Sequence, residues 1–291
     1  TALAASLVSV SAHAGAVSVA GSASMNTEGH SGTGLNAGTT FSMSNQLTFS
    51  GSGEMDNGLN VSISFVLDQG DNETDTTTGA GTAPFDSHSV TVSSDELGSL
   101  TLAGEGGNSA TTKIDTTAAG DLWDNFDQLA NSASITFVDL VSAEGGRANN
   151  LFYSSPDMSG FNVTASYEPQ GGTAESATSY GVNYTGIEGL SLSYATTDVE
   201  TGTASTSGDN TVMKASYAYG PVTVSYSNME HDEAKTDNTL DIEMTSYAVS
   251  YTVSDDLSLT YGSETSEKGS TGTTDAEIDG ITVAYTTGGM T

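Results

Sequence analysis

The sequence predicts an all-β protein in which antiparallel strands form an up-and-down barrel that crosses a membrane. Three observations predict this fold. Apolar residues recur at every second position through most of the 291 residues, short and long connections alternate along the chain, and tyrosines cluster near the segment ends. Successive side chains of a β-strand point to opposite faces, so a period of two gives each strand one apolar and one polar face.

The strands follow in order from this alternation. In residues 39–51 the odd positions include Phe41, Met43, Leu47 and Phe49, whereas the even positions are Ser, Thr and Gln. About fourteen such strands are expected, at residues 15–26, 39–54, 59–69, 86–94, 99–105, 148–155, 161–168, 177–185, 190–197, 210–219, 221–229, 240–253, 257–265 and 276–287. Two further strands, expected beyond the given C-terminus, would complete a barrel of about 16 strands, a size that encloses an aqueous channel.

The connections between these strands alternate in length. Short turns such as Asp56-Asn57-Gly58 contain the Asn and Gly residues that supply the positive φ of tight hairpins. Longer polar segments lie between the short turns, and the longest is 106–147. This alternation arises in a meander whose strands are joined by short turns at one end and by long loops at the other. It is typical of outer-membrane barrels.

The tyrosines support the same fold. Tyr184, Tyr217 and Tyr251 lie close to short turns, and Tyr194 and Tyr226 lie close to long loops. Two rows of tyrosine match the aromatic belts at the two interfaces of a membrane. Tyr is also an ordinary strand residue, and a soluble β-sandwich would alternate too, with its apolar face against a second sheet. The pattern therefore favours the membrane barrel and leaves the sandwich as the alternative.

Composition and motifs exclude several classes of function. Five basic residues stand against 37 acidic ones, for a net charge of −32, and so few bases cannot build the positive patch that nucleic acid requires. The absence of Cys excludes thiolate zinc sites and cysteine nucleophiles. No nucleophile-elbow motif stands out, and no enzyme is predicted. No stretch of 18 consecutive apolar residues indicates a transmembrane helix.

The first residues are typical of a secreted protein. Residues 1–14 form an apolar run that ends in Ala12-His13-Ala14, an A-x-A cleavage pattern. We therefore interpret 1–14 as the remnant of a signal peptide and 15–291 as the barrel domain, with further sequence expected beyond residue 291. A buried strand of the mature fold is the alternative interpretation of 1–14.

Three stretches together resemble the general porins of Gram-negative bacteria. Arg147–Tyr167 contains an Asn-rich strand, a Tyr-x-Ser-Pro corner at Tyr153–Pro156, and Gly160-Phe161 at the opening of the next strand. Val90–Leu102 is similar to the hairpin before the porin constriction loop, and Thr48–Ile63 is similar to the second and third porin strands. No single motif is highly specific, but their order and spacing are, and the resemblance covers nearly the whole chain from residue 15.

The resemblance implies a 16-stranded barrel, usually a homotrimer, in the outer membrane of a Gram-negative bacterium, surrounded by outer-membrane lipid and lipopolysaccharide. It implies passive diffusion of small hydrophilic solutes and ions, with no cofactor. It also implies that the third external loop, which is 106–147 by position, folds inward and narrows the pore. Porins commonly carry several inward Arg residues opposite this loop, whereas this chain has one Arg in total, so a strong transverse field is not expected.

Within the expected constriction loop, Asp121, Asp124 and Asp127 recur at i, i+3 and i+6. On a helix these carboxylates share one side, while Leu122 and Phe126 share another. The spacing predicts a short amphipathic helix that packs on the wall and presents its carboxylates to water. A solvated helix outside the pore is the alternative.

Other charged residues complete the predicted constriction. Glu105 and Asp115 add to its acidic rim, and Lys113, Arg147 and Lys214 offer opposing charge. In the alternating pattern of its strand, Lys214 occupies a position of the polar face. Rings of carboxylates favour cations at a constriction, so the sequence predicts a diffusion pore that prefers cations.

A separate hypothesis concerns calcium. Asp68, Asp71, Glu73 and Asp75 crowd one expected external loop, and Ca²⁺ prefers such oxygen ligands. No EF-hand spacing is present, and a solvated loop kept soluble by its charge is the alternative.

Two other functions remain open from the sequence. The first is a secreted cell-surface protein, either a β-sandwich adhesin or a Ca²⁺-dependent surface-layer protein. The second is a specific sugar or phosphate channel on the same fold. Phosphate is disfavoured because the chain has few basic residues for a pore.

Overall fold

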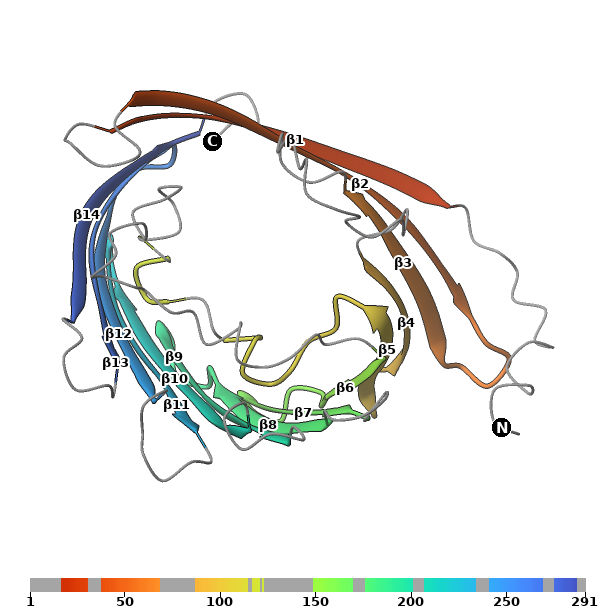
Figure 1. The fold of residues 1–291 in the computed structure, drawn as a ribbon. Helices are drawn as coiled ribbons and strands as arrows, with labels where there is room; N and C mark the ends of the chain where they lie inside the picture. The colour runs from red at the N-terminus through yellow and green to blue at the C-terminus, as the bar shows by residue number, and fades with distance from the viewer. Residues whose placement is uncertain are drawn as a thin grey trace. The chain divides into compact units, whose positions relative to one another are not determined.

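The computed structural model describes residues 17–30, 38–68, 87–114, 117–120, 122, 149–169, 176–200, 207–233, 241–268 and 275–286. The regular elements in these ranges are β-strands (Figure 1). No helix long and apolar enough to cross a membrane occurs among the described residues.

The strands form an antiparallel meander. They are β1 (Ser18–His30), β2 (Gly38–Glu54), β3 (Asn60–Asp68), β4 (Ser87–Ser94), β5 (Gly98–Glu105), β6 (Asn150–Ser154), β7 (Phe161–Glu168), β8 (Ser176–Tyr184), β9 (Leu190–Glu200), β10 (Gly208–Tyr219), β11 (Val222–Glu233), β12 (Ile242–Ser254), β13 (Leu257–Lys268) and β14 (Ala276–Tyr285). Their order in the sheet is their order in the chain. The predicted all-β fold with about fourteen antiparallel strands is confirmed.

Several strands extend further toward the long connections than the apolar alternation predicted. The clearest case is β11, which was expected to end at residue 229 and continues to Glu233. Its last residue pairs with Gly208, the first residue of β10. Backbone hydrogen bonds continue the ladder regardless of side-chain polarity, so the strand outlasts the hydrophobic pattern from which it was predicted.

The chain divides into two compact units. The first comprises residues 1–31, 38–107 and 148–156 and holds β1–β6. Its short turns have the predicted chemistry, because the side-chain oxygen of Asn57 accepts from the Leu59 N–H at 3.2 Å and Gly58 adopts a φ of 82°. At the next short turn the Tyr153 hydroxyl donates to the Leu97 carbonyl at 2.9 Å.

The second unit comprises residues 32–37, 108–147 and 157–291 and holds β7–β14. One face of its sheet carries the tyrosines and aliphatic residues. This apolar face is open, since Val224 is 51% exposed and Tyr251 is 48% exposed. A β-sandwich buries such a face against a second sheet, and no second sheet covers it among the described residues. The sandwich alternative therefore finds no support here.

The buried side chains of this unit lie on the opposite, polar face. Val212, Met229, Ile242, Met244 and Ala276 form a small apolar cluster. Ile114 from the segment before β6 and Ile278 of β14 pack against it. Figure 1 shows the yellow segment that contains Ile114 on the concave side of the strands drawn in green to blue. The core of this unit is therefore made where that segment meets the sheet.

Candidate functional site: a polar wall and the segment docked on it

The polar face of β7–β13 presents two rows of side chains that run across the strands. The Ser179 row consists of Ser166, Ser179, Thr197 and Asn210, which are paired in register on β7–β10. The Ser227 row consists of Lys214, Ser227, Ser246 and Glu264, paired in register on β10–β13. Residues opposite each other on neighbouring strands point to the same face, so each row is a line of hydrogen-bonding groups.

A segment of the predicted constriction loop crosses these rows. We call its described residues 108–114, 117–120 and 122 the docked segment. It bonds first to the Ser179 row: the Ala110 N–H donates to the Ser179 hydroxyl at 2.7 Å, and the hydroxyls of Thr111 and Thr197 lie 2.7 Å apart. Inside the segment, the Ser109 N–H donates to the Thr112 hydroxyl at 2.8 Å.

The docked segment then follows the Ser227 row. The Thr117 carbonyl accepts from the Lys214 ammonium at 3.2 Å. The next two backbone N–H groups, of Ala118 and Ala119, donate to the hydroxyls of Ser227 and Ser246, each at 2.9 Å. The segment thus passes from β10 to β11 to β12 in three successive residues.

Glu264 on β13 completes this row. Its carboxylate accepts from the Leu122 N–H at 2.7 Å, from the Thr117 hydroxyl, and from the Ser246 hydroxyl at 3.3 Å. The side chain is 0% exposed. A buried carboxylate is stable only when it is well hydrogen-bonded, and these three donors meet that need. Each strand from β8 to β13 therefore contributes one side chain to the docking.

Two glycines let the segment approach the wall closely. A Cβ on Gly262 would lie 2.6 Å from the Ala119 Cβ, and a Cβ on Gly280 would lie 3.0 Å from Leu122 Cδ2. Glycine inside a strand often marks such an approach of another part of the chain. Leu122 is only 3% exposed because it lies over these two positions.

The structure places three of the predicted site residues. Lys214 is half-buried on the polar face and holds the docked segment, Lys113 is an exposed member of that segment, and Glu105 is exposed at the end of β5. Asp115, Asp121, Asp124, Asp127 and Arg147, together with the amphipathic helix predicted around three of them, lie outside the described residues. Asp68 ends β3, but its side chain and Asp71, Glu73 and Asp75 also lie outside them.

Apart from Lys214, sequence reasoning missed the docking residues. Ser179, Ser227 and Ser246 are three serines among many, and only their register across the sheet distinguishes them. Glu264 carries a weak signal that could have found it, because it is a carboxylate at a polar-face position two residues after Gly262.

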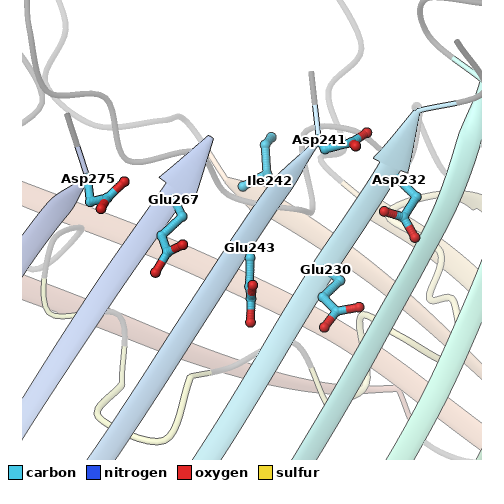
Figure 2. Close-up of a pocket in the computed structure, with 7 residues that line it drawn as sticks. All are labelled: Glu230, Asp232, Asp241, Ile242, Glu243, Glu267 and Asp275. Carbon is cyan, nitrogen blue, oxygen red and sulfur yellow. The ribbon is translucent and has the colours of Figure 1, made fainter. Parts of the chain in front are cut away.

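A second charged feature lies on the other face of the sheet. Glu230, Glu243 and Glu267 are paired in register on β11–β13 and are exposed. With Asp232, Asp241 and Asp275 they line an open groove (Figure 2). Among the described residues, no group of three or more acidic or histidine side chains is arranged to hold a metal ion. The groove is thus a strongly negative surface without a metal site's geometry.

Comparison with known proteins identifies the architecture. The family model described as Gram-negative porin matches residues 1–291. No curated protein matches the chain. The solved structure of Salmonella typhi OmpF in complex with daunomycin is similar, with a TM-score of 0.67, 11% identity, and coverage of 93% of this chain and 86% of that one.

Two further solved structures share the fold. A porin refined at 1.8 Å resolution has a TM-score of 0.64 and 16% identity, and the match covers 94% of this chain and 91% of that one. An anion-selective porin from Comamonas acidovorans has a TM-score of 0.56 and 15% identity, with coverage of 91% and 83%.

Proposed function

Because the chain belongs to the Gram-negative porin family, we propose that it forms a water-filled channel for the passive diffusion of small hydrophilic solutes and ions. The channel lies in the outer membrane of a Gram-negative bacterium. The homotrimer implied by the family resemblance, and contact with outer-membrane lipid and lipopolysaccharide, are part of this proposal. The protein acts as a channel and not as an enzyme.

The observation that carries the proposal is the opposite character of the two faces of one sheet. The apolar face leaves tyrosines such as Tyr217 and Tyr261 about half exposed to whatever surrounds the protein. Monomeric soluble proteins rarely expose a large continuous apolar patch, whereas lipid solvates it, and tyrosine suits the interface. The polar face carries hydroxyls, which suit a water-filled lumen.

The docked segment supplies the second part of the proposal. It lies on the polar face, where hydrogen bonds from six strands hold it. A chain segment held inside a water-filled passage narrows it. We therefore assign 106–147 to the constriction, as the family resemblance implies.

The ion preference is proposed from the charge of the chain. An anion-selective porin is similar in fold to this protein, so the fold alone leaves the sign of the preferred ion undecided. Here 37 acidic residues face five basic ones, and one of those five, Lys214, is engaged with the Thr117 carbonyl. Carboxylates near a constriction attract cations, so we propose a preference for cations.

Planar bilayers test the proposal. The purified protein should require detergent for extraction, insert as discrete conductance steps, and give a reversal potential of the cation-selective sign under a potassium chloride gradient. A preference for chloride would refute the ion preference alone. A protein that purifies without detergent and never conducts would refute the channel, and would revive the surface adhesin.

A further inference from the structure

We propose that Glu264 is a positioning residue for the channel. Its carboxylate clamps the docked segment to β13, and so sets how far that segment stands out from the wall. This inference rests on the channel function proposed above and names a residue on which the passage depends. Glu264 acts through the segment, and permeating ions do not meet its charge.

The burial of Glu264 separates it from Glu267, the other carboxylate of its strand. Glu264 is 0% exposed on the polar face, whereas Glu267 is exposed on the apolar face. An ionised carboxylate accepts hydrogen bonds only, and it has about four lone-pair sites. Three of these are occupied by donors of the protein. The carboxylate oxygens are thus engaged by donors of the protein and shielded from water in the lumen.

The two closest partners of this carboxylate belong to two different residues of the docked segment. One is the Thr117 hydroxyl, and the other is the Leu122 backbone N–H, which donates at 2.7 Å. A single side chain therefore holds both Thr117 and Leu122 against the wall. Because the bond at Leu122 is to its backbone N–H, the clamp depends on the reach of the Glu264 side chain and not on the identity of the side chain at position 122.

Lys214 on β10 also bonds Thr117. Its ammonium donates to the Thr117 carbonyl at 3.2 Å. Lys214 and Glu264 belong to the same row and stand three strand spacings apart, about 14 Å at the usual inter-strand distance. Opposite charges thus flank the segment, while the serines between them bond its N–H groups.

The competing explanation is that Glu264 is a pore charge that attracts cations directly. Two conservative substitutions separate the two roles. Glu264→Asp keeps the charge but shortens the reach by one methylene. Glu264→Gln keeps the reach and one acceptor oxygen for the Leu122 N–H, and its amide can donate to the Thr117 hydroxyl oxygen, but the charge is lost. The clamp is broken by Asp, whereas a pore charge is broken by Gln.

The first experiment needs no channel activity. The chain has no cysteine, so a single Leu122→Cys substitution gives a unique thiol at a position that is buried against Gly262 and Gly280. The rate at which a polar maleimide modifies this thiol is measured in the Leu122→Cys variant. It is then measured in the double variants that also carry Glu264→Asp or Glu264→Gln. Glu267→Asp and Glu267→Gln, on the exposed face of the same strand, are the matched controls.

The clamp predicts a higher labelling rate with Glu264→Asp than with Glu264→Gln, and no change with either Glu267 control. Equal rates for the two Glu264 variants, or a higher rate with Gln, would overturn it. If the Asp variant fails to assemble, Glu264→Met replaces it, because Met keeps the length and removes every acceptor. A Met variant as well protected as the parent would also overturn the clamp.

The second experiment measures the channel. With a clamp, Glu264→Asp should lose the single uniform conductance level and show flicker between sublevels, while Glu264→Gln keeps the parent's level and reversal potential. A reversal potential that shifts toward chloride in Gln but stays unchanged in Asp would assign Glu264 as a pore charge and refute the clamp. If the parent never conducts, the proposed function fails, and the labelling rates still decide the clamp.

Discussion

At the scale of single residues, the docking of the segment depends on two kinds of wall position. Some are glycines, which have no side chain, and others carry a side chain that forms a hydrogen bond with the segment. Gly262 and Gly280 leave room for Ala119 and Leu122. Ser227 and Ser246 accept from two consecutive backbone N–H groups. Both kinds of position can be changed by substitution, and each change has a control position elsewhere on the sheet.

Gly262→Ala is expected to displace the docked segment. The added methyl would lie 2.6 Å from the Ala119 Cβ, closer than van der Waals contact allows, and overpacking of this kind costs about 1–3 kcal/mol. The measurement is the unfolding midpoint of the folded protein in denaturant. Gly51→Ala is the control, because its methyl would make ordinary contact with Ile63 at 3.5 Å. Equal loss in both variants would contradict the close approach.

Ser227→Ala combined with Ser246→Ala should loosen the segment. The change leaves two backbone N–H groups without their acceptors, and each such group, when shielded from water, costs about 1–3 kcal/mol. The readout is the labelling rate of the Leu122→Cys thiol described above. Ser225→Ala, on the same face of β11 but outside the Ser227 row, should leave the rate unchanged. Faster labelling in that control would show that the serines act generally on the strand.

At the scale of elements, each strand combines an apolar face for its surroundings with a polar face for the lumen and the docked segment. On β11, Val224 is 51% exposed on the apolar face, while its neighbour Ser225 points to the polar face and is half-buried. The same two-sidedness holds for β9, β10, β12 and β13. Consecutive residues of one strand therefore meet different solvents, if the apolar face meets lipid.

Val224→Arg and Ser225→Arg test this difference. An Arg on the lipid face of a barrel is costly by an amount that depends on its depth, up to about 2–4 kcal/mol at the bilayer midplane, whereas an Arg in a watery lumen keeps its hydration. We expect Val224→Arg to fold into lipid vesicles much less efficiently than Ser225→Arg. The measurement is the fraction of heat-modifiable, protease-resistant protein after refolding. Equal folding of the two variants would indicate that Val224 faces water.

At the scale of the whole molecule, charge dominates the expected behaviour. The net charge is −32, and six carboxylates line the groove near the long-connection ends of β11–β14. No single carboxylate has to bind an ion for such a distribution to raise the local concentration of cations. Its effect must then depend on ionic strength, because salt screens charges that lie in water.

The cation preference should therefore fall as salt rises. The Debye length shrinks from about 10 Å at 0.1 M to about 3 Å at 1 M, so carboxylates on the wall lose their influence over the centre of the passage. Reversal potentials measured at the same concentration ratio but at increasing mean salt should approach the value of a non-selective pore. A preference that stays constant over this range would point instead to a narrow site that binds cations directly.

Calcium can be tested on the same protein. The acidic loop that contains Asp71, Glu73 and Asp75 predicts that Ca²⁺ raises the melting temperature of the assembled protein and that EDTA lowers it, because the ion relieves repulsion among carboxylates. Melting is followed by the loss of the oligomer on heating. Unchanged melting in EDTA would remove the structural calcium hypothesis. Magnesium at equal concentration controls for general screening.

The docking depended on information that no local pattern holds. Many serines and threonines share the polar face, and nothing in their immediate sequence separates Ser246 from Ser250. Ser246 bonds the docked segment because it stands level with Ser227 and Glu264 on the neighbouring strands, whereas Ser250 bonds Thr260. Lys214 was recognised as a polar-face residue from its parity. Its bond to Thr117, which lies 97 positions away in the chain, could not be predicted from parity.

By itself, the amino-acid sequence determined the strands, their two faces and the short turns. These are local properties. A period of two can be recognised from the residues of one strand, and a tight turn such as the one at Gly58 can be recognised from the few residues that form it. The tertiary structure alone decided which groups of the wall hold the docked segment and that Glu264 is buried beneath it. That outcome depends on the register of six strands at once and on contacts with a segment that lies 69 to 147 positions earlier in the chain.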